Sequence, residues 1–178
     1  LFRSSAASDV YKRQKLTTPW DSTTLVCEKI YEIDIDDGGN EDQVRTLAFK
    51  PDGTRMFVGG RDLDKLRQYD LATPFDLRSG VTPGGVSADL STIETNMRNI
   101  QFNPDGTQLF LSGNERDVGR MNKINLSTAY DITTLSSTAE TFDLGSRANN
   151  MMGFIFASNF TKLFAVSYTH LRAHETGY

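Results

Sequence analysis

The chain has 178 residues, a formal net charge of −4 at pH 7 and 38% hydrophobic residues. The acidic balance argues against a broad nucleic-acid-binding surface, and no apolar run reaches the length of a membrane span. A single cysteine, Cys27, excludes an internal disulfide and is expected to lie in a strand as a small apolar residue.

Both ends of the chain read as translated sequencing adapter. Ser4–Gln14 ("SSAASDVYKRQ") and residues 166–176 ("VSYTHLRAHET") back-translate into the two partner adapters of a transposase-type library, in one open frame. Such segments are excluded from fold reasoning. We therefore expect residues 1–14 and 166–178 to be non-native and residues 15–165 to be a fragment open at both ends. The alternative is a native tail in which His170 and His174, spaced for one helical face, bind a metal.

A repeat of 55 residues organises the chain between these ends. "LTTPWD" begins at Leu16, "LATPFD" at Leu71 and "LSTAYD" at Leu126, which gives repeats over 16–70, 71–125 and an incomplete 126–165. We expect this six-residue motif, called the corner, to join one structural unit (blade) of a repeat fold to the next. Its aspartate should cap backbone amides and its aromatic ring should fill the seam between blades. The corner residues are Trp20, Asp21, Phe75, Asp76, Tyr130 and Asp131.

Strands are expected over 27–35, 44–60, 65–71, 97–113 and 151–165, with turns inside the longer segments. Pro-Asp-Gly between two apolar runs predicts a hairpin turn, because proline presets φ and glycine accepts a positive φ. The turn residues are Pro51, Asp52, Gly53, Pro104, Asp105 and Gly106. The third copy has Phe160 in place of glycine, so its turn is expected to differ.

The apolar runs 56–58, 109–111 and 163–164 lack alternation, which predicts strands covered on both faces. No segment of ten or more residues shows a helical period. Each repeat therefore holds about four short strands, the number found in one propeller blade. The fold class is all-β: a partial β-propeller of about two and a half four-stranded blades. Closed propellers have about four to eight blades, so the remaining blades of a larger parent are an expected partner.

The motifs "FKPDGTRMFV" and "RQYDLATPFD" resemble the Thr-Pro-Trp-Asp propeller repeats of bacterial and tailed-phage proteins, and more broadly the YVTN-type and WD-repeat-like propellers. The resemblance covers nearly all of residues 16–164. It implies a β-propeller and a surface, secreted or virion-associated protein that contacts another protein or a glycan.

Two groups of residues are candidates for ligand binding. Asp34, Asp36 and Asp37 in "DIDDGGNED" offer carboxylates in a glycine-containing loop, which suits calcium, although a solvated loop is the alternative. Arg45 and Arg98 hold matching positions before a strand. If they face the central channel they would bind anions; otherwise each would pair with a carboxylate of a neighbouring blade.

The segment between the adapter-like ends contains no histidine, no Gly-x-Ser-x-Gly elbow and no zinc-ligand pattern. We therefore expect a non-enzymatic binding or structural module that needs no cofactor, with calcium as the one candidate ion. The first alternative is a lactonase-like or lyase-like propeller enzyme with a metal in the central channel. The second is an intracellular scaffold.

Overall fold

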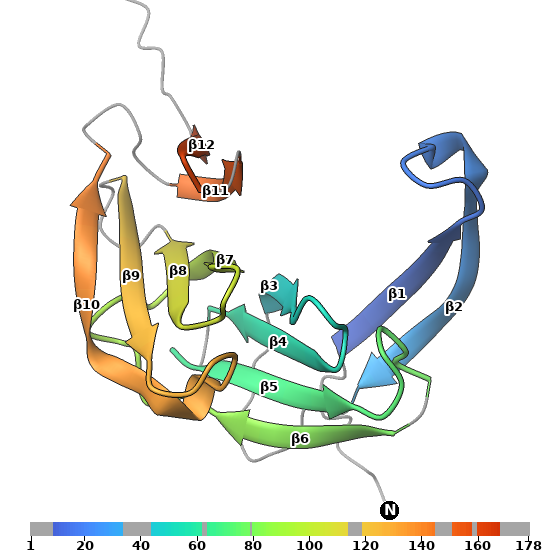
Figure 1. Cartoon of the computed structure of the whole chain (residues 1–178), viewed down its shortest axis with the longest axis horizontal. Helices are drawn as coiled ribbons and strands as arrows, with labels where there is room; N and C mark the ends of the chain where they lie inside the picture. The colour runs from blue at the N-terminus through green and yellow to red at the C-terminus, as the bar shows by residue number, and fades with distance from the viewer. Residues whose placement is uncertain are drawn as a thin grey trace, which may run out of the picture.

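The computed structural model describes residues 9–33, 44–61, 64–78, 80–113, 119–144, 151–157 and 160–167 (Figure 1). Within these ranges the chain forms twelve strands in four antiparallel sheets, and no α-helix. Two short 3-10 turns, η1 (Ser22–Thr24) and η2 (Ile132–Thr134), are its only helical turns in the same ranges. The predicted all-β fold is confirmed.

Two sheets are complete four-stranded meanders. The first, called blade 1, consists of β3 (Val44–Phe49), β4 (Arg55–Gly60), β5 (Leu66–Leu71) and β6 (Val81–Val86). The second, called blade 2, consists of β7 (Met97–Phe102), β8 (Gln108–Gly113), β9 (Arg120–Leu126) and β10 (Leu135–Asp143). In both blades each strand pairs with the next one along the chain, so the local hairpins determine the sheet order.

Two further sheets have two strands each and lie near the two ends of the arc in Figure 1. β1 (Asp9–Leu16) and β2 (Leu25–Ile33) correspond to the third and fourth strands of a blade. β11 (Met151–Ala157) and β12 (Lys162–Ser167) correspond to the first and second strands. β1 begins inside the segment expected to derive from adapter, and it pairs with β2 along its whole length.

The corner motif lies inside a blade, which corrects the expectation that it joins one blade to the next. In blade 1 it connects β5 to β6, and in blade 2 it connects β9 to β10. The strand after each corner folds back onto the strand before it, with Leu71 opposite Val81 and Leu126 opposite Leu135. The blades are therefore displaced by one strand from the sequence repeats.

Apolar side chains fill the spaces between sheets. Met56, Phe57 and Val58 are all buried, and they alternate between two clusters on opposite faces of β4. The run 109–111 in β8 is buried on both faces as well, so the prediction of doubly covered strands is confirmed for both runs. For the third run it is wrong, because the side chain of Phe164 in β12 is 58% exposed.

The innermost strands are joined by side chains that bond to the backbone of the next blade. Thr46 Oγ1 accepts a hydrogen bond from the buried backbone N–H of Ile100 at 3.1 Å. Asn99, at the equivalent position in β7, donates through Nδ2 to the carbonyl oxygen of Phe154 at 2.6 Å. The same position in successive blades thus ties β3 to β7 and β7 to β11.

A second tie joins β5 and its neighbouring strands to the corner of blade 2. The Gln68 side chain accepts from the buried N–H of Ile132 at 3.0 Å and donates to Asp131 at 3.2 Å. Arg55 Nη1 donates to the carbonyl oxygen of Tyr130 at 2.9 Å. Because a buried N–H without a partner is strongly destabilising, these contacts fix how the two blades dock.

Each full blade locks its corner onto its own Pro-Asp-Gly turn. Tyr130 has φ of 55° and its N–H bonds to the carbonyl oxygen of Gly106 at 2.9 Å; Phe75 and Gly53 repeat this arrangement. In both blades the aromatic ring occupies the space where a Cβ on the glycine would lie. The turn therefore requires glycine for two reasons, its positive φ and the ring against its Cα.

In the third turn the structure describes Phe160 but not the two residues before it. Phe160 adopts φ of 64°, close to the 72° of Gly53 and the 75° of Gly106, so this residue keeps the positive φ despite its side chain. Non-glycine residues in this region carry a strain of about 1–2 kcal/mol. The ring of Phe160 stacks on Phe156, with centroids 4.8 Å apart, and this packing compensates for the strain.

We expect Gly106→Ala to lower the free energy of unfolding by roughly 2–4 kcal/mol, because it combines a positive φ with overlap on the Tyr130 ring. Gly153→Ala is the matched control, since a Cβ there meets nothing within 4 Å. The control should change stability by no more than about 0.5 kcal/mol. Urea unfolding followed by circular dichroism measures the stability of both variants. Equal losses of stability would show that the Tyr130 ring does not constrain the Gly106 turn.

Candidate functional site

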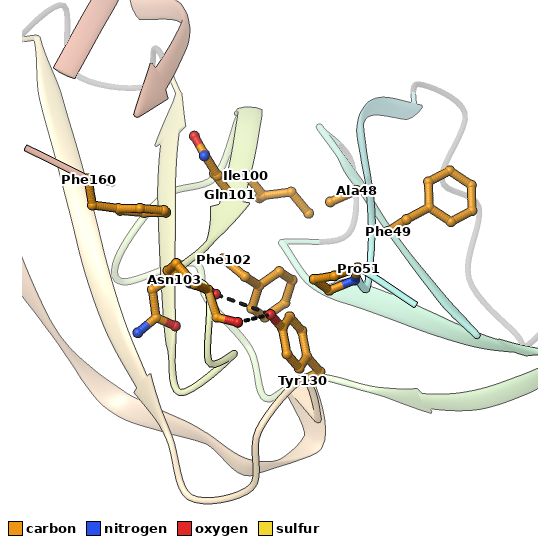
Figure 2. Close-up of a pocket in the computed structure, with 10 residues that line it drawn as sticks. Ala48, Phe49, Pro51, Ile100, Gln101, Phe102, Asn103, Tyr130 and Phe160 are labelled. Atoms are coloured by element: carbon orange, nitrogen blue, oxygen red, sulfur yellow. Dashed lines mark hydrogen bonds between the residues drawn. The ribbon is translucent and has the colours of Figure 1, made fainter. Parts of the chain in front are cut away.

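A pocket with a volume of about 170 Å³ lies where the turn ends of β3 and β7 meet (Figure 2). Blade 1, blade 2 and the turn before β12 all contribute to it. None of the lining residues carries a charged side chain. The lining residues are Ala48, Phe49, Pro51, Ile100, Gln101, Phe102, Asn103, Pro104, Tyr130 and Phe160.

Aromatic rings form much of the pocket wall. The rings of Phe102 and Tyr130 have centroids 5.4 Å apart and a tilt of 47°, and Phe102 also packs on Phe57 at 4.5 Å. Phe57 and Phe102 are buried between blades 1 and 2. The wall is therefore an extension of the inter-blade core and is held rigidly by it.

Phe160 supplies the opposite wall, where its ring points across the opening in Figure 2. Its ring stacks on that of Phe156 with an interplanar angle of 18°. The ring centroids of Phe160 and Phe110 are 6.1 Å apart. The two equivalent turns have glycine at this position, and there the ring of the corner aromatic covers the turn. Replacement of glycine by Phe160 thus puts a ring of the third hairpin into the pocket.

The Tyr130 hydroxyl bonds to the backbone of the Pro-Asp-Gly turn in its own blade. It donates to the carbonyl oxygen of Pro104 at 2.8 Å (Figure 2). The carbonyl oxygen of Asn103 lies 3.3 Å from the hydroxyl and accepts the N–H of Gly106 at 3.0 Å. Burial raises the pKa of Tyr130 above its ordinary value, and the negative charges of Asp105 and Asp52 raise it further. The hydroxyl therefore remains a protonated donor at physiological pH.

Gln101 lines the pocket and also joins β7 to β11. Its Oε1 accepts from the backbone N–H of Phe156 at 3.0 Å, which ties β7 to β11. An N–H can bond only to the oxygen of an amide, so this contact fixes the side-chain orientation. Nε2 has no hydrogen-bond partner within the described ranges, and it is not among the buried polar atoms.

The predicted turn residues divide between the pocket and its support. Pro51 and Pro104 line the pocket. Asp52 and Asp105 lie outside it and accept hydrogen bonds from the N–H and hydroxyl groups of Thr54 and Thr107. A hydrogen bond and ion pair with Lys50, followed by the Thr54 contacts, lower the pKa of Asp52. The Thr107 contacts lower the pKa of Asp105.

Of the predicted corner aromatics, only Tyr130 reaches the pocket. It is 8% exposed, whereas Phe75 is 48% and Trp20 98% exposed. The corner aspartates each accept a hydrogen bond from the backbone N–H two residues further on. These pairs are Asp21 with Thr23, Asp76 with Arg78, and Asp131 with Thr133.

Of the predicted ion-binding residues, the structure describes Arg45 and Arg98. Arg45 donates from Nη1 to the Asn96 side chain at 2.6 Å, at the entrance to β7 of the neighbouring blade. The Nε atom of Arg98 is buried and has no hydrogen-bond partner in the described part of the chain. The calcium candidates Asp34, Asp36 and Asp37 lie outside the described residues.

Among the residues that the structure describes, no group of three or more histidine, cysteine, aspartate or glutamate side chains is placed to hold a metal. No helix found there is long and apolar enough to cross a membrane.

Comparison with known proteins gives the fold. No family model and no curated protein sequence matches the chain. The chain is similar to a putative 6-phosphogluconolactonase from Bacteroides uniformis, with a TM-score of 0.52, 13% identity, and coverage of 94% of this chain and 49% of that one. The chain forms part of a β-propeller. Two crystal structures of Sqt1 from Chaetomium thermophilum match with a TM-score of 0.49 and 17% identity.

This chain covers about a third of the length of Sqt1 and about half that of the lactonase. At these identities the likeness concerns the fold alone.

The sequence did not predict the pocket residues, apart from the turn prolines, Tyr130 and the unusual Phe160. No spacing signal singles out Gln101, because Arg98 and Asn99 are further polar residues of the same strand.

Ionisation of Tyr130 should destabilise the fold at alkaline pH. The pKa of Tyr130 is raised in the folded state. Its contribution to the free energy of unfolding is therefore fully present below about pH 10 and is lost as the pH rises above that value. The unfolding free energy of Tyr130→Phe should therefore decline less steeply than that of the wild-type chain above about pH 10. Identical alkaline slopes for the two chains would contradict this assignment.

Proposed function

We propose that this chain is part of a non-enzymatic binding propeller that holds a protein partner at the pocket between blades 1 and 2. The observation that supports the proposal most directly is the pocket itself: about 170 Å³, uncharged, and walled by the rings of Phe102, Tyr130 and Phe160. Rigid aromatic pockets of this kind are where interfaces concentrate their binding energy.

The size of the pocket favours a side chain over a metabolite. Sites for small-molecule ligands have volumes of about 300–1,000 Å³, so this pocket is smaller than the usual range. An anchor residue from a partner protein needs only a pocket that its own side chain fills.

The alternatives fit the pocket less well. A glycan presents many hydroxyl groups that need both donors and acceptors, and these walls are mostly apolar. A lactonase-like or lyase-like enzyme needs acidic, asparagine or histidine side chains that converge on a metal, and the likeness to the lactonase at 13% identity concerns the fold alone. The resemblance of the repeats to surface and virion proteins makes an extracellular or virion-borne partner the setting we propose.

Ala48→Phe tests the proposal, because Ala48 lines the pocket and a ring there would fill it. Ala88→Phe is the matched control, since it adds the same ring at an exposed position outside the pocket. The full chain is used to select peptides from a displayed random library. Selected peptides should bind the wild-type chain and Ala88→Phe equally and Ala48→Phe at least about tenfold more weakly.

Phe160→Ala provides a second readout that does not depend on filling the pocket. Loss of this ring enlarges the pocket on one side, so the selected anchor side chains should become larger. Melting temperatures verify that each variant is folded. The proposal is wrong if filling the pocket leaves peptide binding unchanged, or if the chain binds glycans and selects no peptide.

A further inference from the structure

We propose that the corner between β1 and β2 is a binding site for a β-hairpin with a Pro-Asp-Gly turn, whose glycine docks under the ring of Trp20. This inference goes beyond the proposed function and does not rest on the pocket. Hairpins of this kind form the first two strands of blades 1 and 2. The partner is the corresponding hairpin of the larger parent protein, which would supply the first two strands of the sheet that β1 and β2 complete.

The corner at Trp20 has the same internal hydrogen bonds as the corner of blade 2. Asp21 accepts from the N–H of Thr23 at 3.0 Å, as Asp131 does from the N–H of Thr133 at 3.1 Å. A 3-10 turn follows each aspartate, η1 in the first corner and η2 in the second. The two corners therefore present their aromatic residues in the same way.

Trp20 lacks the contacts that its counterparts make. Its φ is 65°, close to the 57° of Phe75 and the 55° of Tyr130. Phe75 and Tyr130 each donate an N–H to the carbonyl oxygen of a turn glycine at 2.9 Å, whereas no described residue accepts the N–H of Trp20. The side chain of Trp20 is 98% exposed. A large apolar ring on a strained backbone thus faces solvent, next to an N–H that can reach the same kind of acceptor.

Two turns in the same molecule show what fits against this corner. A Cβ built on Gly53 would lie 2.3 Å from the Phe75 ring, and one built on Gly106 would lie 2.2 Å from the Tyr130 ring. Neither ring could approach its turn so closely if the turn residue carried a side chain. The corner aromatic therefore selects a turn that has glycine at positive φ, and its N–H bonds to the carbonyl oxygen of that glycine.

β1 has an edge for the strand that follows such a turn. Within the described ranges β1 pairs only with β2, whereas β5 and β9 each pair with strands on both sides. In blades 1 and 2 the first leucine of the corner donates its N–H to the threonine after the glycine, Leu71 to Thr54 and Leu126 to Thr107, both at 2.8 Å. Leu16 holds the same position in β1. Main-chain hydrogen bonds supply the affinity of an added strand, so docking does not require particular side chains in β1.

A second copy of this chain does not provide the hairpin. The rings of Phe75 and Tyr130 already cover the turns at Gly53 and Gly106. The third turn carries Phe160 at a similar positive φ, with a Cβ where the other two turns have only hydrogen. By the geometry of those two turns, this Cβ would overlap a corner ring. The hairpin must therefore come from a segment whose turn glycine is still uncovered.

The first test combines the full chain with a synthetic peptide that has the sequence of residues 47–58 and spans the turn at Gly53. Trp20 is the only tryptophan, so its fluorescence reports docking directly. We expect the emission to move to shorter wavelength and acrylamide quenching to fall by about half, since Trp20 is 98% exposed and the equivalent Phe75 is 48% exposed. A peptide with Gly53→Ala should bind at least about tenfold more weakly. A shift in emission with the concentration of the chain alone would show that a second copy occupies the site, and would overturn the inference.

Variants of the chain test the ring itself, with a labelled peptide and fluorescence anisotropy. Trp20→Ala should weaken binding at least about tenfold. Trp20→Phe is the matched control and should bind as the wild-type chain does, because phenylalanine holds this position in blade 1. Both variants should keep the wild-type melting temperature, since the side chain of Trp20 is exposed. Wild-type affinity in Trp20→Ala would contradict the assignment.

A fusion removes the dependence on a free peptide that has to fold. When β1 and β5 are aligned on Leu16 and Leu71, Tyr11 holds the position of Leu66. A copy of residues 44–65 placed directly ahead of Tyr11 therefore presents the hairpin in the same chain. Burial of Trp20 in this fusion, measured by the same shift and quenching, supports the inference. Unchanged Trp20 emission in the fusion would overturn it, as would equal binding of the glycine and alanine peptides.

Discussion

The structure depends on backbone N–H groups that face a neighbouring blade and receive an acceptor from its side chains. The N–H of Ile100 bonds to Thr46, that of Ile132 to Gln68 and that of Phe156 to Gln101. Two of these three contacts are buried and the third is partly buried, so an unpaired group would be strongly unfavourable. Apolar packing pulls the sheets together, while these bonds specify their register.

The same ties create the pocket. Its walls come from three successive hairpins, and it exists because the ties hold β3, β7 and β11 side by side at their turn ends. Gln101 belongs to both, since it lines the pocket and its Oε1 accepts the bond that joins β7 to β11.

The sequence predicted the local features well because their causes are local. The turn glycines, the aspartate caps and the doubly buried runs follow from residue types within a few positions of one another. The predicted placement of the corner was wrong. A sequence repeat does not reveal whether the strand after the corner pairs with the strand before it or with the strand that follows. Phe160 was expected to avoid a positive φ, but it has one, and its ring stacks on Phe156. The pocket depends on contacts between repeats that carry no spacing signal.

Hydrogen exchange of the three side-chain-bonded amides tests the account most directly. If the side-chain bonds join the blades into one body, the amides of Ile100, Ile132 and Phe156 should exchange as slowly as the ladder amides in the middle of β4 and β8. Rapid exchange of these three amides, with slow exchange inside each sheet, would show that the blades open independently and would contradict the account.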